Sequence, residues 1–164
     1  MLSILTTMNP SVYIETSIIS YLTARPSSDI RSAANQNITA DWWDNRRTDF
    51  ELYISEFVVV EAARGHKEAS ARRLLALEDI SELRISDAAK TLAESLITEG
   101  ALPVKAEMDA FHVAVATVNG INYLLTWNCT HIANAVMRPR IEAICRKLGY
   151  EPPVICTPSE LLEK

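Results

Sequence analysis

Residues 105–131, KAEMDAFHVAVATVNGINYLLTWNCTH, decide the fold of this chain. The first half of the stretch is apolar on nearly every side, which predicts a helix buried in the interior. Gly120 follows the last turn, where a residue of left-handed conformation commonly ends a helix. Residues 123–126 then form an apolar run of strand length. Because ligands bind at the carboxyl ends of parallel strands in α/β proteins, Thr126 and Asn128 are expected at such a binding edge.

Asp109 lies in the first turns of the predicted buried helix. A carboxylate in apolar surroundings is costly unless a cation or a set of hydrogen-bond donors meets it, so we expect a partner for Asp109. The simplest alternative is that Asp109 caps its own helix or bonds His112 one turn on. His112 is interpreted as a core or helix-face histidine with a local hydrogen bond.

The rest of the chain alternates between strand and helix patterns. Strands are expected at residues 12–15, 50–54, 83–85, 123–126 and 154–156. Helices are expected at residues 18–22 after a Thr16-Ser17 cap, at 29–47, from a Ser55 cap through Glu61, and at 67–77, 87–98, 105–119 and 132–148, with a short last helix opened by Pro158. In the helix over 67–77, Leu74, Leu75 and Leu77 are expected to face inward. This alternation predicts an α/β fold with a mostly parallel sheet covered by helices on both faces.

Length and composition favour one domain over residues 1–164. The chain is 48% hydrophobic and 23% charged, and a chain of this length can bury a sizeable core. Residues 1–8 are expected to be a flexible leader, with Met8 as an alternative start. None of the four glycines belongs to a glycine-rich phosphate loop, which excludes the common nucleotide-binding fingerprints.

The cysteines and the net charge narrow the class of protein further. Three widely spaced cysteines without a Cys-x-x-Cys pair indicate neither a disulfide framework nor a zinc site, so a cytoplasmic protein is expected. No segment is long and apolar enough to span a membrane. The net charge of −5 argues against a broad basic surface for nucleic acid. It does not exclude a nuclease, because metal ions held by acidic residues would meet the phosphates.

Four polar side chains occupy equivalent places in successive β-α units: Glu15, Glu61, Asp109 and Asn128. In a parallel sheet all four converge on the carboxyl edge, where three carboxylates repel one another unless a cation lies between them. Oxygen ligands without a histidine or cysteine cluster favour Mg²⁺ or Mn²⁺. Such an ion activates water and stabilises charge on a phosphoryl group.

The segments that carry these residues resemble the PIN domain, in its VapC-like toxin branch. They are VYIETS at residues 12–17, SEFVVVEAARG at 55–65, DAFHVAVA at 109–116 and LTWNCTHI at 125–132. The resemblance extends over residues 11–161. It implies a three-layer α/β/α fold with a parallel five-stranded sheet, a homodimer, and Mg²⁺- or Mn²⁺-dependent cleavage of RNA by the toxin of a toxin–antitoxin pair.

The family's acidic positions carry over residue by residue. Glu15 stands where the first acidic residue, usually Asp, follows the first strand. Glu61 matches the glutamate of the second motif, and Asp109 matches the acidic residue that opens the central helix. Asn128 stands at a position that is usually Asp, and His131 lies near a further polar position. The longer side chain of Glu15 shifts its carboxylate, and Asn128 removes one negative charge from the site.

Other polar and aromatic residues have more ordinary interpretations. Thr16 and Thr126 are candidates for binding the carboxylates, a metal-bound water or the substrate, although hydroxyls at strand ends often only cap helices. Cys129 and His131 are not expected to form a nucleophile pair, because neighbouring positions in the sequence do not create the needed geometry and no orienting acid is evident. Trp42, Trp43 and Phe57 are interpreted as core or dimer contacts.

The sequence therefore predicts a metal-dependent endoribonuclease, with an antitoxin protein as its partner. One alternative is a PIN-fold module that binds RNA or protein and has lost catalysis at Asn128. A phosphatase or DNA nuclease on a similar scaffold is another, because fold alone does not determine the substrate.

Overall fold

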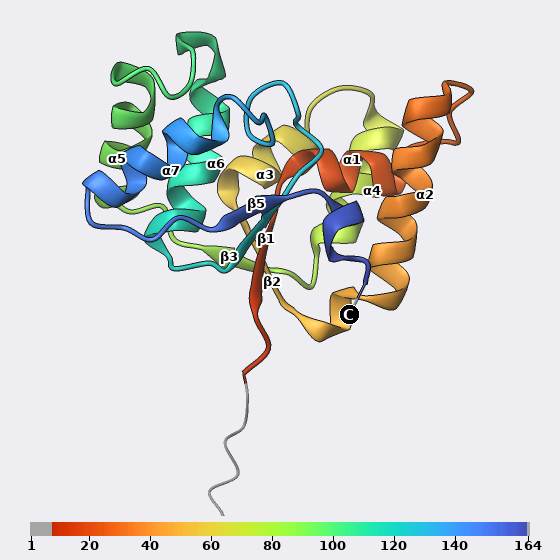
Figure 1. Cartoon of the computed structure of the whole chain (residues 1–164). Helices are drawn as coiled ribbons and strands as arrows, with labels where there is room; N and C mark the ends of the chain where they lie inside the picture. Colours follow the sequence, from red (N-terminus) through yellow and green to blue (C-terminus); the bar gives the residue numbers. More distant parts are fainter. Residues whose placement is uncertain (1–7, 164) are drawn as a thin grey trace, which may run out of the picture.

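Five short parallel strands form a single sheet at the centre of the computed structural model, which describes residues 8–163 (Figure 1). In chain order the strands are β1 (Ser11–Ile14), β2 (Glu51–Ser55), β3 (Ser81–Leu83), β4 (Tyr123–Leu125) and β5 (Val154–Cys156). They lie side by side in the order β3-β2-β1-β4-β5, and every neighbouring pair is parallel. The predicted parallel five-stranded sheet is confirmed. The expected leader, residues 1–8, lies outside the described residues except for Met8.

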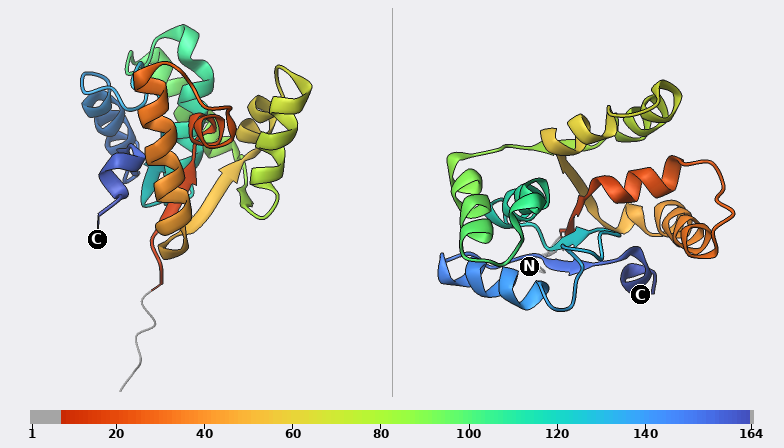
Figure 2. Two further views of the ribbon diagram at one scale, coloured as in Figure 1. Left: turned by 90° about the vertical axis from the view of Figure 1, so that its right-hand side faces the viewer. Right: turned by 90° about the horizontal axis from the view of Figure 1, so that it is seen from above.

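Helices cover the sheet on both faces, as Figures 1 and 2 show. One group consists of α1 (Thr16–Thr23), α2 (Ile30–Asn45) and α4 (Lys67–Leu77), and the other of α5 (Asp87–Thr98), α6 (Glu107–Val118) and α7 (Arg138–Lys147). The short α3 (Glu56–Ala62) directly follows β2, and single 3₁₀ turns lie at η1 (Arg47–Asp49), η2 (Val104–Ala106) and η3 (Pro158–Leu161). This is the predicted three-layer α/β/α architecture.

The core is built around β1, which lies in the middle of the sheet. Val12, Tyr13 and Ile14 are fully buried, because helices cover both faces of this strand. Helix α6 is also buried on most sides from Ala110 to Thr117, as its sequence predicts. This central position brings the residue after β1 close to the residues that follow β2 and β4.

Several boundaries are displaced from the prediction by one or two residues, and the start of α7 is displaced further. The strand expected at residues 83–85 is β3 at Ser81–Leu83. The helix expected at residues 132–148 begins only at Arg138, because side chains bind the preceding backbone. Asn128 Oδ1 accepts a hydrogen bond from the His131 N–H, and Asn134 Oδ1 accepts from Val136 and Met137. Such local bonds favour turns over helix.

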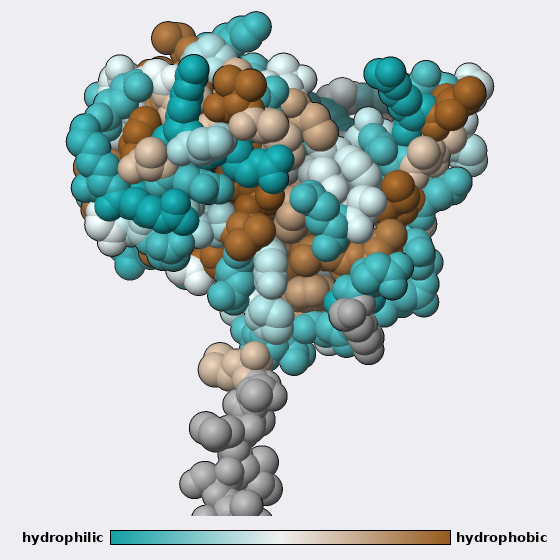
Figure 3. All heavy atoms as spheres, viewed as in Figure 1, coloured by the Kyte–Doolittle hydropathy of each residue, from teal (hydrophilic) through white to brown (hydrophobic). Residues whose placement is uncertain are grey.

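Two details of the surface complete the fold. Leu75, expected to face inward, is 66% exposed, whereas Leu77 in the same helix is buried. Hydrophilic residues cover much of the surface around α7, with hydrophobic residues between them in separate groups (Figure 3). Among residues 8–163, none of the helices combines the length and the apolar character needed to cross a membrane.

Candidate metal site at the carboxyl edge of the sheet

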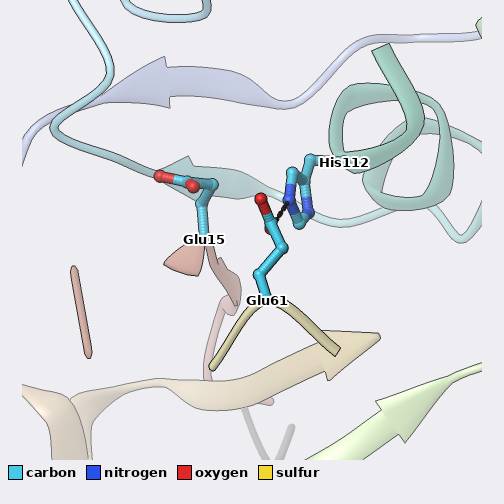
Figure 4. A group of neighbouring side chains, drawn as sticks. All are labelled: Glu15, Glu61 and His112. Atoms are coloured by element: carbon cyan, nitrogen blue, oxygen red, sulfur yellow. Dashed lines mark hydrogen bonds and ion pairs between the residues drawn. The ribbon is translucent and has the colours of Figure 1, made fainter. Parts of the chain in front are cut away.

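Two glutamates and a histidine from three different elements meet where β1 ends (Figure 4). Glu15 follows β1, Glu61 lies in α3, and His112 lies in α6. One potential ligand atom from each lies within 4.8 Å of the others. The carboxylate of Glu61 lies beside the imidazole of His112, whereas that of Glu15 turns toward the loop after β4. The predicted convergence of the β1 and α3 carboxylates is therefore present.

Glu15 is held by two hydroxyl groups that bind the same carboxylate oxygen. Ser17 Oγ donates to Oε2, and Thr126 Oγ1 donates to Oε2 at 2.7 Å. Each hydroxyl also accepts a backbone N–H, at 2.8 Å from Trp127 and 2.9 Å from Asn128. Within residues 8–163, the other oxygen, Oε1, has no hydrogen-bond partner.

Glu61 shows the same division between its two oxygens. Thr16 Oγ1 donates to Oε1 at 2.7 Å, and His112 Nε2 lies 2.5 Å from that oxygen. In the described part of the chain, Oε2 makes no hydrogen bond. Each glutamate thus presents one anchored oxygen and one oxygen that is available to a ligand.

Asp109 belongs to a neighbouring cluster with Asn128 and His131. Asn128 Nδ2 donates to Asp109 Oδ1 at 3.0 Å, and His131 Nδ1 lies 2.7 Å from Oδ2. Both oxygens of Asp109 are therefore engaged, unlike those of Glu15 and Glu61. The two clusters are joined through Thr126, which binds both Glu15 and the Asn128 N–H.

The charges in this region perturb the protonation of both members of the Glu61–His112 pair. Burial raises the pKa of Glu61, but the hydrogen bond and the charge of His112 together with the Thr16 hydroxyl lower it more, so the net displacement is downward. Burial lowers the pKa of His112, but the bond to Glu61 and the charges of Glu15, Glu61 and Asp109 raise it more. The structure therefore favours an ionised Glu61 beside a protonated His112.

Three hydroxyl residues expected to cap helices serve the site instead. Thr16 and Ser17 bind the two glutamates, and Ser55 Oγ lies 2.7 Å from the buried Tyr13 hydroxyl. Neither α1 nor α3 has a side-chain cap bond at its N-terminus. The Thr16 and Thr126 hydroxyls thus bind carboxylates, which is the first of the roles expected for them.

The prediction of a local hydrogen bond for His112 is wrong. Its ring contacts Tyr13 and Glu61, which are far from it in sequence, and it is fully buried. The sequence contained one signal for this position: His112 lies three residues after Asp109, so both are on the same side of α6. The expected core contacts of Trp42 and Phe57 are present, since Trp42 is fully buried and Phe57 stacks on Phe111 at 4.7 Å.

The donor set suits a hard divalent cation. Glu15 and Glu61 each have a free carboxylate oxygen, and the Asp109 carboxylate lies in the adjoining cluster. Such oxygens are the preferred ligands of Mg²⁺ and Mn²⁺. The imidazole of His112 lies within the same group of potential ligand atoms, but both of its nitrogens face other side chains.

Comparison with known proteins identifies the family to which this architecture corresponds. The sequence model described as the PIN domain matches residues 12–128, which contain all four candidate residues. No curated protein matches the chain.

Solved structures with a similar fold include FitAcB, VapC20 and VapBC2. FitAcB from Neisseria gonorrhoeae is 14% identical, with a TM-score of 0.54 over 92% of this chain and 99% of that chain. VapC20 from Mycobacterium tuberculosis, a toxin that cleaves the sarcin–ricin loop, is 20% identical, with a TM-score of 0.50 over 70% and 87%. VapBC2 from Rickettsia felis, solved with a DNA fragment from its promoter, is 14% identical, with a TM-score of 0.49 over 89% and 97%.

Proposed function

The chain belongs to the PIN domain family, and we propose that it is a metal-dependent endoribonuclease that acts as the toxin of a toxin–antitoxin pair. One observation carries the proposal: Glu15 and Glu61 each present a free carboxylate oxygen at the carboxyl edge of the sheet, and hydrogen bonds through Thr126 and Asn128 link Glu15 to Asp109. The family consists mainly of nucleases, and VapC20, which shares the fold, is a toxin that cleaves the sarcin–ricin loop.

In this proposal Glu15, Glu61 and Asp109 hold Mg²⁺ or Mn²⁺, and Asn128 assists by binding Asp109. The ion, when bound, polarises water and offsets the charge that develops on the scissile phosphate. The protein's own part is to hold each carboxylate in position. Thr126 serves Glu15 through its hydroxyl, which also binds the backbone of the next loop.

RNA is the proposed substrate, and His131 is the proposed contact to it at the edge of the site, where its side chain is 15% exposed. An antitoxin protein is the proposed partner, because the motifs of the chain resemble those of VapC-like toxins and VapC20, which shares the fold, is a toxin. We also propose a homodimer, on the basis of family resemblance. The proposed compartment is the cytoplasm, where the free thiols of this chain stay reduced.

The test compares the wild type with Asp109→Asn and Glu61→Gln on a mixed RNA pool in Mg²⁺, Mn²⁺ or EDTA. Cleavage is expected with either ion and not in EDTA, and each variant is expected to lose it by on the order of 100-fold or more, because the site loses a charged ligand. Glu107→Gln is a matched control: it removes an exposed carboxylate from the first turn of the same helix as Asp109. Far-UV circular dichroism establishes that all variants are folded.

Cleavage that persists in Asp109→Asn and Glu61→Gln contradicts the proposed site. A folded wild type that binds RNA or an antitoxin but does not cleave any RNA supports the second candidate, a PIN-fold binding module without catalysis. That candidate is favoured by one feature, the engagement of both Asp109 oxygens by Asn128 and His131. DNA and phosphomonoester substrates in the same assay distinguish a DNA nuclease or a phosphatase.

A further inference from the structure

Four polar side chains form a continuous hydrogen-bonded chain from the core of the molecule to Glu61. Ser55 Oγ lies 2.7 Å from Tyr13 Oη, Tyr13 Oη lies 2.7 Å from His112 Nδ1, and His112 Nε2 lies 2.5 Å from Glu61 Oε1. Ser55, Tyr13 and His112 are all fully buried. Only Glu61 reaches solvent, with 24% of its side chain exposed.

The direction of these bonds follows from the chemistry of the groups. An ionised carboxylate can only accept hydrogen bonds. Nε2 of His112 therefore carries a proton and donates a hydrogen bond to Glu61. Nδ1 is satisfied by the Tyr13 hydroxyl, which in turn is satisfied by Ser55. Both ring nitrogens are therefore occupied, and the imidazole is fixed in orientation. Burial raises the pKa of Tyr13, so this hydroxyl keeps its proton.

Polar groups buried this deeply need a reason, because a hydrophobic core of the same shape would not require matched partners. This hydrogen-bonded chain of side chains contacts only one of the two Glu61 oxygens. It thereby orients Glu61 while its other oxygen remains available to a ligand. The same logic is seen at metal sites, where partners of the ligands set the ligands' orientation.

We propose that His112, held by Tyr13 and Ser55, is a positioning residue that fixes the Glu61 carboxylate for cation binding. This inference rests on the proposed function, since it gives His112 a role at the same site. In it His112 is not a ligand, because both of its nitrogens are committed to Tyr13 and Glu61. The coupling extends from Glu61 through α6 and β1 to the end of β2.

The test measures Mn²⁺ binding to the full chain by isothermal titration calorimetry, independently of catalysis. Tyr13→Phe keeps the ring and removes only the hydroxyl that holds His112. We expect the Mn²⁺ Kd to rise by on the order of 10-fold, the lower end of the effect of removing a ligand's partner. In the RNA assay, the Mn²⁺ concentration for half-maximal cleavage should rise equally, and saturating Mn²⁺ should restore most of the rate.

Tyr53→Phe is the matched control, because Tyr53 pairs with Tyr13 in the sheet register and its hydroxyl binds Glu51, away from the site. We expect its Mn²⁺ Kd to equal that of the wild type. His112→Gln retains an amide donor that can reach Glu61, whereas His112→Leu has none. A smaller loss of Mn²⁺ affinity in His112→Gln than in His112→Leu supports positioning. These two variants also carry the test if Tyr13→Phe does not fold.

Glu61→Gln separates this inference from the proposed function. If Mn²⁺ binding to the wild type is weakened by Glu61→Gln but unaffected by Tyr13→Phe and by both His112 variants, the proposed site stands and the positioning role is wrong. If Mn²⁺ binding does not depend on Glu61, both proposals are overturned. If the Tyr13 and His112 variants are less stable to unfolding but bind Mn²⁺ with an unchanged Kd, the hydrogen bonds between these side chains have only a structural role. That result also contradicts positioning.

Discussion

Thr126 connects a carboxylate of the candidate site to the loop after β4 through one hydroxyl. Its Oγ1 donates to Glu15 and accepts the backbone N–H of Asn128, and the residue is fully buried. Both bonds use the same oxygen, so replacing the hydroxyl by a methyl group leaves the Asn128 N–H without this partner and removes one of the two hydroxyls that bind Glu15 Oε2. The energetic importance of Thr126 therefore exceeds that of one ordinary hydrogen bond.

We predict that Thr126→Val lowers the free energy of unfolding by about 1–3 kcal/mol, the cost of an unsatisfied Asn128 N–H together with one lost hydrogen bond to a carboxylate. The shape of the side chain is nearly unchanged, so the loss reports on the hydroxyl. Equilibrium unfolding in urea measures it. The measurement is made without metal, so that the stability of the fold is observed by itself.

Thr117→Val is the control, since it makes the same change at another buried threonine. Thr117 Oγ1 donates to the carbonyl of Val113 within α6, and this carbonyl also accepts the backbone bond of the helix. Its loss should therefore cost less than about 1 kcal/mol. Equal destabilisation by the two substitutions would contradict the special role of Thr126.

At the scale of the elements, the C-terminal end of α6 is set by the conformation of Gly120. Gly120 has a φ of 69°, and the chain forms two reversed hydrogen bonds there. The N–H of Gly120 donates to Thr117 at 3.1 Å, and that of Ile121 donates to Ala116 at 3.0 Å. This Schellman arrangement stops the helix and turns the chain toward β4.

We predict that Gly120→Ala lowers the free energy of unfolding by about 1 kcal/mol, because an L-residue is strained in the left-handed region. An added Cβ would have no atom within 4 Å, so the loss would be conformational rather than steric. Urea unfolding measures the change. Gly120→Asn should cost less, because Asn tolerates this conformation better; a larger loss for Asn than for Ala would contradict this explanation.

The order and type of the elements could be predicted from the sequence, because each depends on local periodicity. The strand and helix alternation required a parallel sheet, and the parallel sheet required Glu15 and Glu61 to meet at one edge. The start of α7 was harder to predict, because it depends on hydrogen bonds between the side chains of Asn128 and Asn134 and the backbone. Such bonds compete with helix in ways that a periodic pattern does not reveal.

The hydrogen-bond network of the site could not be predicted, because it depends on contacts between residues that are distant in sequence. Thr16 and Ser55 have the pattern of helix caps, and only the packing of strands and helices shows that they bind Glu61 and Tyr13. The role of His112 was hidden for the same reason. Its partners Tyr13 and Glu61 come from β1 and α3, and nothing local to α6 identifies them.

At the scale of the whole molecule, the carboxyl edge concentrates negative charge within a protein whose net charge is already −5. Three carboxylates, Glu15, Glu61 and Asp109, act on the buried ring of His112 and raise its pKa. The protonated ring in turn lowers the pKa of Glu61. In the absence of metal, the protonated His112 thus stabilises the ionised Glu61 beside it, and this contribution depends on pH.

The signs of the two displacements define the pH range of this contribution. The pKa of Glu61 is lowered, so its contribution is complete above its ordinary value of 4.5 and is lost as pH falls through the folded-state pKa. The pKa of His112 is raised, so its contribution is complete below its ordinary value of 6.5 and is lost as pH rises through the folded-state pKa. Both contributions are complete only between pH 4.5 and 6.5.

We therefore predict that the difference in unfolding free energy between the wild type and His112→Gln, measured in EDTA, is largest between pH 4.5 and 6.5 and smaller on both sides. Urea unfolding across a pH series measures it. His66→Gln is the control, because His66 is exposed and makes no cap bond at α4, so its difference from the wild type should not peak there. If the difference in unfolding free energy between the wild type and His112→Gln is constant with pH, the ring is equally protonated in the folded and unfolded chain. In that case the Glu61–His112 ion pair does not contribute to the stability of the fold.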